Sequence, residues 1–193
     1  MKILSYRGVS LLSKGICAFT WGDYSHIAWP LVSGNIIEAW KGGIRITQHP
    51  FTGHSRRTRV WLHDVIDFDE SKRPAVEGFL LSQVGKGYDY SGILRFMRRR
   101  DPRRWRDKTA KDVDPADVNR WICSSIGAYA LARYERPLQD LPWWRISPRL
   151  VVASPRVGLG TEIFPGTPWP DIESWPLVDA ECTDPYLWEP VPL

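Results

Sequence analysis

The stretch NRWICSSIGAYAL, residues 119–131, predicts the helix around which the rest of the chain folds. After Cys123, small and apolar residues recur at helical spacing, and Pro137 marks the end of the segment. A cysteine in a first helical turn lies beside unpaired backbone N–H groups, at the positive end of the helix dipole. That position lowers the pKa of a thiol and makes it more nucleophilic at neutral pH. Cys123 is therefore a candidate nucleophile, provided that the chain also supplies a base.

The candidate base lies on a strand far upstream. Residues 24–32, YSHIAWPLV, are rich in β-branched and aromatic side chains, and IIEAW comes next at 36–40 after a turn. Two antiparallel strands joined by a tight hairpin can bring Glu38 beside His26. A carboxylate in that place fixes the imidazole tautomer and stabilises the imidazolium that forms when histidine takes a proton. Cys123, His26 and Glu38 are therefore a candidate nucleophile, base and orienting group.

Each of these residues also has a purely structural interpretation. A lone cysteine such as Cys123 is commonly a buried apolar thiol, and His26 can equally be a hydrogen-bonded core histidine. Glu38 would then be a hairpin-edge carboxylate paired with Lys41 or Arg45. The residue spacing by itself leaves both interpretations open.

Other segments predict further strands and helices. Three of them have strand character: KILSYR (2–7), IRITQH (44–49) and RVWLHDVI (59–66). With the two strands above, the simplest arrangement is one meandering antiparallel sheet. A short helix is expected within residues 8–22, a longer one from Pro74, and a basic one at 93–100 after a loop at 85–92. The predicted fold class is α+β, with the sheet packed against the helix that carries Cys123.

The C-terminal part of the chain differs in composition. Eleven of the 16 prolines and five of the 11 tryptophans lie from Pro137 onward. We expect one domain at residues 1–154 and an irregular, Pro- and Trp-rich arm at 155–193 that packs on it.

The net charge of +4 is concentrated in one run. Residues 95–108 carry eight basic and two acidic side chains, which gives +6, so the remainder of the chain sums to −2. This run is a candidate contact for nucleic acid, anionic lipid or another polyanion, although a solvated loop has the same composition. Its arginines are Arg95, Arg98, Arg99, Arg100, Arg103, Arg104 and Arg106.

Composition and cysteine usage limit the remaining possibilities. With 43% hydrophobic and 25% charged residues, the chain is typical of a globular protein. It has no apolar run long enough for a transmembrane segment and no signal-peptide pattern in residues 1–20, so we expect a cytoplasmic protein. Cys17, Cys123 and Cys182 make no disulfide framework, and Cys17 is expected to be a buried apolar side chain.

We expect neither a metal nor another cofactor. His49, His54 and His63, with Asp64, are of residue types that bind metals. However, the HPFTGH segment crosses a Pro/Gly loop instead of a rigid ligand frame.

The order of four segments also resembles a known family: GDYSHIAW, IIEAWKGGI, YDYSG and WICSS. They are similar to the circularly permuted branch of the NlpC-type papain-like cysteine amidases and peptidases, with the YiiX-like proteins nearest. In that branch, a strand histidine and a glutamate in an IEA-type segment precede a cysteine that opens a helix in a WxCSE-like motif. ISPRLVVASP at 146–155 resembles the segment that comes after this helix in the family. The similarity covers residues 1–155.

The resemblance implies a circularly permuted papain-like fold and assigns roles to residues of this chain. Cys123 corresponds to the nucleophile, His26 to the base, Glu38 to the orienting acid and Tyr88 to a tyrosine near the site. The chain departs from the pattern at Ser125, where a glutamate is usual, which leaves the helix contacts and the substrate pocket in question.

The activity implied is that of a thiol hydrolase, a cysteine amidase or peptidase that forms an acyl-enzyme on Cys123. A cell-wall peptide is the first substrate class suggested and a lipid-linked amide or ester the second. The oxyanion would be bound by the backbone N–H of Cys123, with Tyr88, Ser25 and Ser124 as further candidates for substrate or oxyanion contacts. The alternative is a non-catalytic binding module that uses the basic run at 95–108.

Overall fold

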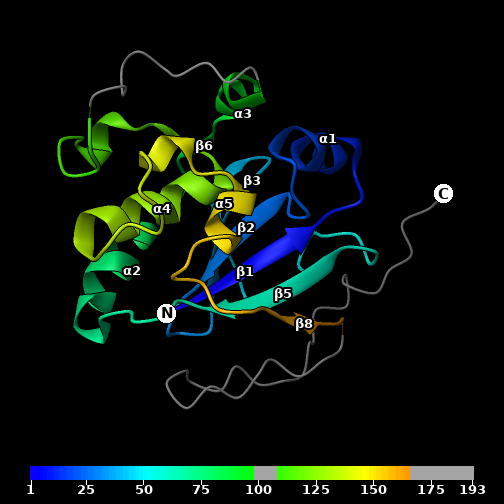
Figure 1. The fold of residues 1–193 in the computed structure, drawn as a ribbon, viewed down its shortest axis with the longest axis horizontal. Helices are drawn as coiled ribbons and strands as arrows, with labels where there is room; N and C mark the ends of the chain where they lie inside the picture. Colours follow the sequence, from blue (N-terminus) through cyan, green and yellow to red (C-terminus); the bar gives the residue numbers. More distant parts are fainter. Residues whose placement is uncertain (98–107, 166–193) are drawn as a thin grey trace.

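The sheet at the centre of the molecule is antiparallel, with six strands in the order β4-β3-β2-β1-β5-β8 (Figure 1). The computed structural model describes residues 1–97 and 108–165 of the chain. The strands of this sheet are β1 (Lys2–Arg7), β2 (His26–Pro30), β3 (Ile36–Trp40), β4 (Gly43–Thr47), β5 (Arg59–Asp64) and β8 (Thr161–Ile163). The fold is therefore of the predicted α+β class.

The strands form the predicted meander from β1 to β4, but β5 then pairs with β1 and not with β4. Leu4 of β1 has Ala28 of β2 on one side and Leu62 of β5 on the other. The N-terminal strand is thus an inner strand of the sheet. β8 lies beyond β5, so residues 161–163 of the segment predicted to be an irregular arm are an edge strand.

The connection between β4 and β5 explains why the meander is broken. Phe51, in this connection, is buried in one core cluster with Tyr6 of β1 and Val60 of β5. Burying these apolar side chains on one face of the sheet favours a connection that crosses that face, which brings β5 to the free edge of β1.

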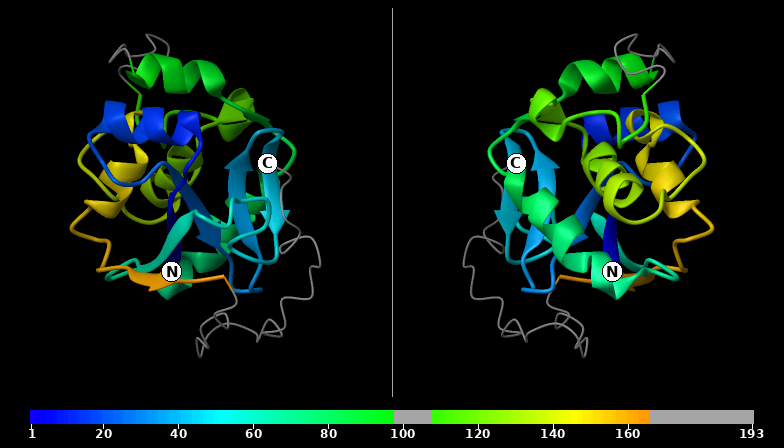
Figure 2. Two further views of the ribbon diagram at one scale, coloured as in Figure 1. Left: turned by 90° about the vertical axis from the view of Figure 1, so that its right-hand side faces the viewer. Right: turned by 90° about the vertical axis from the view of Figure 1, so that its left-hand side faces the viewer.

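Helices α2 (Arg73–Ser82) and α4 (Cys123–Tyr134) pack together on the other face, and the main hydrophobic core lies between them and the sheet (Figure 1). Helices α1 (Leu11–Thr20) and α3 (Tyr90–Met97) lie side by side over the end of the sheet toward which β1 runs (Figures 1 and 2). The remaining elements are α5 (Pro148–Val152), the two-stranded sheet of β6 (Gly87–Tyr88) and β7 (Arg120–Trp121), and the 3-10 turns Glu70–Lys72, Pro115–Asp117 and Trp143–Arg145.

The start of α4 is fixed against β2 by Trp29. The indole Nε1 of Trp29 donates to the carbonyl of Cys123 at 3.1 Å, and the indole is fully buried. A Cβ on Gly127 would come within 2.0 Å of the same indole, so only glycine allows helix and strand to approach this closely.

Ser125 closes the first turn of α4. Its hydroxyl accepts the backbone N–H of Ile122 at 3.1 Å and donates to the Ile122 carbonyl at 3.0 Å. A glutamate at the third helical position commonly accepts the same N–H in a capping box. Ser125 therefore satisfies the same backbone group that a glutamate at this position of a capping box would.

Two sequence predictions near α1 and α3 need correction. The predicted loop at 85–92 contains β6 and the start of α3, because β6 pairs in parallel with β7, which is more than 30 residues away along the chain. Cys17 is half-buried, not buried, since α1 has no fully buried residue.

Among the described residues, no helix is both long and apolar enough to span a membrane.

Candidate active site

Cys123 is the first residue of α4 and is 1% exposed. Burial alone would raise the pKa of its thiol, but the positive charge and hydrogen bond of His26 outweigh burial and lower this pKa. Backbone hydrogen bonds from Ile27 and Ser124 act in the same direction. The start of the helix and the strand that carries His26 thus stabilise a thiolate together.

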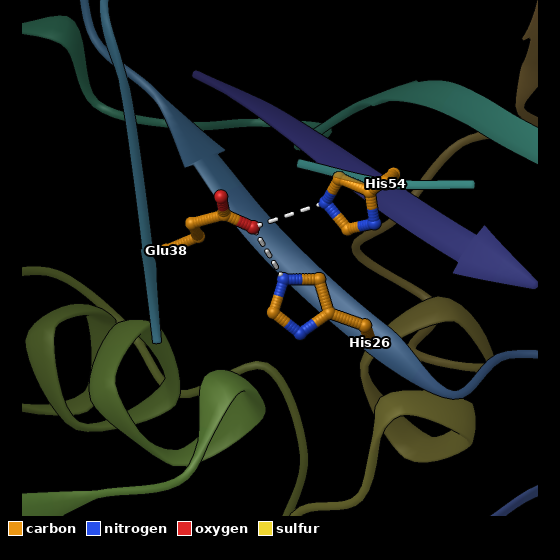
Figure 3. Close-up of side chains that lie close together, drawn as sticks. All are labelled: His26, Glu38 and His54. Atoms are coloured by element: carbon orange, nitrogen blue, oxygen red, sulfur yellow. Dashed lines mark hydrogen bonds and ion pairs between the residues drawn. The ribbon is translucent and has the colours of Figure 1, made fainter. Parts of the chain in front are cut away.

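His26 is the first residue of β2 and connects the thiol to Glu38. Its Nε2 lies 2.8 Å from Oε2 of Glu38, and its second ring nitrogen points away from that carboxylate (Figure 3). Burial lowers the pKa of His26, but Cys123 and then Glu38 raise it, to about 9. The two groups therefore stabilise each other's charged forms, the thiolate of Cys123 and the imidazolium of His26.

Glu38, on β3, is 1% exposed and makes contacts through both carboxylate oxygens. Oε2 meets His26 and also His54, at 3.2 Å, while Oε1 accepts from Nε and Nη2 of Arg45 at 2.8 and 2.6 Å. Burial raises the pKa of this carboxyl, but the bonds from His26 and His54 hold it well below the usual range. The pairing with Arg45 anticipated as a structural alternative thus coexists with the contact to His26.

His54 is a member of this cluster that the sequence analysis did not assign to it. It stacks on Tyr6 with ring centroids 4.4 Å apart and meets Trp40 edge-on at the same distance. Burial lowers its pKa in spite of Glu38, so it is neutral where His26 is charged. The available signal was Gly53, whose positive φ of 77° allows the loop to turn against the Arg45 guanidinium.

His26, Glu38 and His54 are also the described residues that could hold a metal ion, since their ligand atoms lie within 4.8 Å of one another. Two imidazoles and a carboxylate are ligand types that zinc accepts. The guanidinium of Arg45, however, lies 2.6 Å from the other oxygen of Glu38 and opposes a second cation. The three side chains are therefore suitable metal ligands by type, but the positive charge of Arg45 beside Glu38 disfavours a metal ion at this site. His63 is elsewhere, bonded to Ser5 and to the carbonyl of Gly158.

The three candidates for substrate or oxyanion contacts differ in their surroundings. The hydroxyl of Tyr88 is hydrogen-bonded to the thiol of Cys123, and burial and the neighbouring sulfur raise its pKa, so it remains a donor. The Ser25 hydroxyl accepts the N–H of Gly8 at 3.0 Å and donates to a carbonyl at 3.3 Å. The Ser124 hydroxyl donates to the carbonyl of Ile146 at 2.6 Å. Tyr88 is thus the one of the three whose side chain meets the sulfur.

Two hollows adjoin these residues and share the lining residues Ile16, Ser25 and Tyr88. The first, which we call the inner slot, includes Cys123 and has about 20 Å3 of accessible space, little more than one water molecule needs. The second, the outer cleft, includes His26 and has about 310 Å3 of accessible space. The thiol therefore borders the smaller hollow and the imidazole the larger one, and the two hollows are neighbours.

The predicted polyanion contact lies almost entirely outside the described residues. Residues 98–107 are not described, and of Arg95 only the backbone, in α3, is placed.

Comparisons with known proteins give a relation in fold alone. No family model and no curated protein matches the chain. The structure is similar to the crystal structure of the metalloprotein YiiX from Escherichia coli O157:H7, DUF1105, with a TM-score of 0.59. The two are 16% identical in sequence, and the match covers 85% of this chain and 97% of that one. The chain therefore has a YiiX-like fold.

Proposed function

We propose that this protein is a thiol hydrolase with Cys123 as nucleophile, His26 as general base and acid, and Glu38 as the orienting carboxylate. The observation that carries the proposal is the continuous contact from thiol to imidazole to carboxylate, with the pKa of Cys123 lowered and that of His26 raised. An imidazolium beside a cysteine stabilises the thiolate, which a nucleophile must form and which a cysteine that only fills the core does not. We interpret the fold as a circularly permuted papain-like domain that includes the predicted 1–154 segment and, beyond it, the edge strand at 161–163.

In the first step, the Cys123 thiolate attacks the carbonyl carbon of an amide or ester and the carbon–sulfur bond forms. The tetrahedral intermediate then breaks its bond to nitrogen or oxygen, and the leaving amine or alcohol takes the proton of the His26 imidazolium. Glu38 holds the imidazole in position and stabilises its charged form throughout.

The negative oxygen of the intermediate needs donors next to the sulfur. The backbone N–H of Cys123, at the start of α4, is one candidate, and the Tyr88 hydroxyl is the other. Because the pKa of Tyr88 is raised, its hydroxyl keeps its proton at neutral pH.

In the second step, neutral His26 takes a proton from water, and the resulting hydroxide attacks the thioester. The carbon–sulfur bond breaks, the acid is released and the thiolate–imidazolium pair is restored. A transferase would take the same course with an alcohol or amine in the place of water. The family resemblance offers a cell-wall peptide as the first substrate class and a lipid-linked amide or ester as the second.

The test compares wild type with Cys123→Ala on a muropeptide amide and on p-nitrophenyl acetate, with Cys17→Ala as a matched control on the half-buried thiol. We expect turnover to vanish only in Cys123→Ala, with the circular dichroism spectrum unchanged. Turnover that survives this substitution would exclude the mechanism. An unreactive Cys123 would favour the alternative, a binding module that uses the basic run at 95–108.

A further inference from the structure

The carboxylate of Glu38 is held at both oxygens, but by different donors. Oε1 accepts two bonds from Arg45, at 2.8 and 2.6 Å. Oε2, the oxygen 2.8 Å from Nε2 of His26, also lies 3.2 Å from Nε2 of His54 (Figure 3). The last torsion of a glutamate side chain is only weakly restricted, so bonds to one oxygen do not fix the other. His54 is therefore a second donor at the oxygen that the base contacts.

The ring of His54 is itself held in one place. It stacks on Tyr6 with an angle of 16° between the rings, and the edge contact with Trp40 restrains it from another side. Only 6% of its side chain is exposed. Its backbone N–H donates to the carbonyl of Phe51 at 2.9 Å, and the side chain of Phe51 is buried in the core. The loop thus presents this imidazole to Glu38 in a defined position.

The bond between these two side chains runs from the imidazole to the carboxylate. Burial lowers the pKa of His54, so its ring is neutral and has a single N–H. An ionised carboxylate only accepts hydrogen bonds, so this proton is on Nε2, which faces Glu38. His54 therefore orients the carboxylate without bringing a further positive charge to it.

We propose that His54 is a positioning residue of the active site, which donates to Oε2 of Glu38 and so keeps this oxygen against His26 throughout the reaction. This inference rests on the proposed function. The bond between His26 and Glu38 is strongest while the imidazole is charged, and it weakens once the leaving group has taken the proton. The bond from neutral His54 does not depend on that charge, so it keeps the carboxylate in place for the second step.

The first test measures kcat and KM on p-nitrophenyl acetate, because His54 also lines the outer cleft and a binding role has to be separated from positioning. His54→Phe keeps a ring beside Tyr6 but has no donor, whereas the amide of His54→Gln can donate from near the place of Nε2. We expect kcat to fall about tenfold in His54→Phe, with KM within about twofold, and to recover to within about threefold of wild type in His54→Gln. His54→Leu, which also lacks a donor, replaces His54→Phe if that variant does not fold.

The matched control is His49→Phe. His49 is a half-buried histidine of the same connection, its ring packs near Phe51, and it lines neither hollow. We expect kcat in His49→Phe to stay within about twofold of wild type. A loss equal to that of His54→Phe would mean that disturbance of the loop, and not the missing donor, lowers turnover.

The second test asks whether His54 acts through Glu38. His54→Phe is combined with Glu38→Gln, and the two single losses in kcat are compared with that of the double variant. Residues that act through one another give losses that do not multiply. We therefore expect His54→Phe to lower kcat by less than about twofold in the Glu38→Gln background.

The third test is independent of turnover. The ring N–H of His26 that faces Glu38 is observed by proton NMR and assigned by its loss in His26→Ala. We expect it to exchange with water at least about tenfold faster in His54→Phe than in wild type, and at the wild-type rate in His54→Gln.

The outcomes separate this inference from the proposed function. Turnover that depends on Cys123 but is the same in His54→Phe, with unchanged exchange of the His26 proton, would overturn the positioning role and leave the hydrolase standing. A tenfold loss that persists in the Glu38→Gln background would also overturn it. If wild type shows no turnover that depends on Cys123, the proposed function fails, and faster exchange in His54→Phe would still support the contact by which His54 holds Glu38.

Discussion

Replacing His26 by alanine should change the pH dependence of Cys123 alkylation. The pKa of His26 rises from 6.5 to about 9 in the folded protein, with Cys123 the largest contribution against burial. A shift of this size corresponds to roughly 3 kcal/mol, at 1.36 kcal/mol per unit. Without the imidazolium, burial again dominates at the sulfur, and the thiol pKa rises to at least its ordinary value of 9.0.

The expected change in rate is set by the thiolate fraction. A thiol with a pKa of 9.0 is about 1% ionised at pH 7, whereas the lowered pKa of the paired thiol in wild type makes its ionised fraction larger. Alkylation of His26→Ala should therefore slow by up to about 100-fold at pH 7. The more basic thiolate is intrinsically more nucleophilic, which recovers part of the loss and leaves a decrease of about tenfold or more.

The assay measures iodoacetamide labelling of each cysteine from pH 5 to 9, with mass spectrometry to locate the label. In wild type, the rate at Cys123 should depend less steeply on pH than in His26→Ala, where it should rise about tenfold per unit below the thiol pKa. Cys17, whose pKa is raised by partial burial, provides an internal reference that rises with pH in both proteins.

His63→Ala is the control substitution, because His63 is also a buried histidine but bonds Ser5 and a backbone carbonyl instead of the site. In His63→Ala, the rate of Cys123 alkylation should depend on pH as it does in wild type. A Cys123 profile that His26→Ala leaves unchanged, in a protein whose circular dichroism is intact, would refute the thiolate–imidazolium pair.

The same contacts lead to three further predictions. Glu38→Gln should lower kcat/KM by about 10²-fold or more, because the imidazolium loses its carboxylate. The variant should also have a lower free energy of unfolding in urea than wild type, and this difference should shrink as pH falls. The depressed pKa of Glu38 stabilises the fold above pH 4.5, and this contribution is lost as the carboxylate is protonated. Tyr88→Phe should lower kcat by about 10²-fold with little change in KM, measured on p-nitrophenyl acetate. Gly127→Ala should destabilise by about 3 kcal/mol or more in thermal melts because of the Trp29 indole, whereas Gly78→Ala, with open space around its Cβ, should be neutral or stabilising.

The parts of the site that local sequence determines could be predicted. His26 and Glu38 are twelve residues apart on two strands joined by a hairpin, and the register places Glu38 opposite Ala28, two residues from His26. Side-chain alternation and a short turn are enough to bring such residues together. The helix at Cys123 is likewise marked by spacing that a single segment contains.

Contacts between distant segments could not be predicted in the same way. His54 lies in a connection with no periodic pattern. Tyr6 and Trp40 contact its ring, and Arg45 bonds the carbonyl of Thr52 in the same loop, so three different strands hold it against Glu38. The pairing of β5 with β1 depends on which face of the sheet is covered, which no single segment encodes.

Arg45 is the residue that decides between two chemistries available to one cluster. The imidazoles of His26 and His54 and the carboxylate of Glu38 would suit a divalent cation if no other positive charge were paired with the carboxylate. Arg45 instead takes one oxygen through two donors, and its guanidinium stacks on Trp40 at 4.6 Å, which holds it in place. The remaining oxygen then faces the two imidazoles, of which His26 carries the proton. A carboxylate shared between a fixed guanidinium and a protonated imidazole is arranged to stabilise a charged base, which is what a thiolate at Cys123 requires.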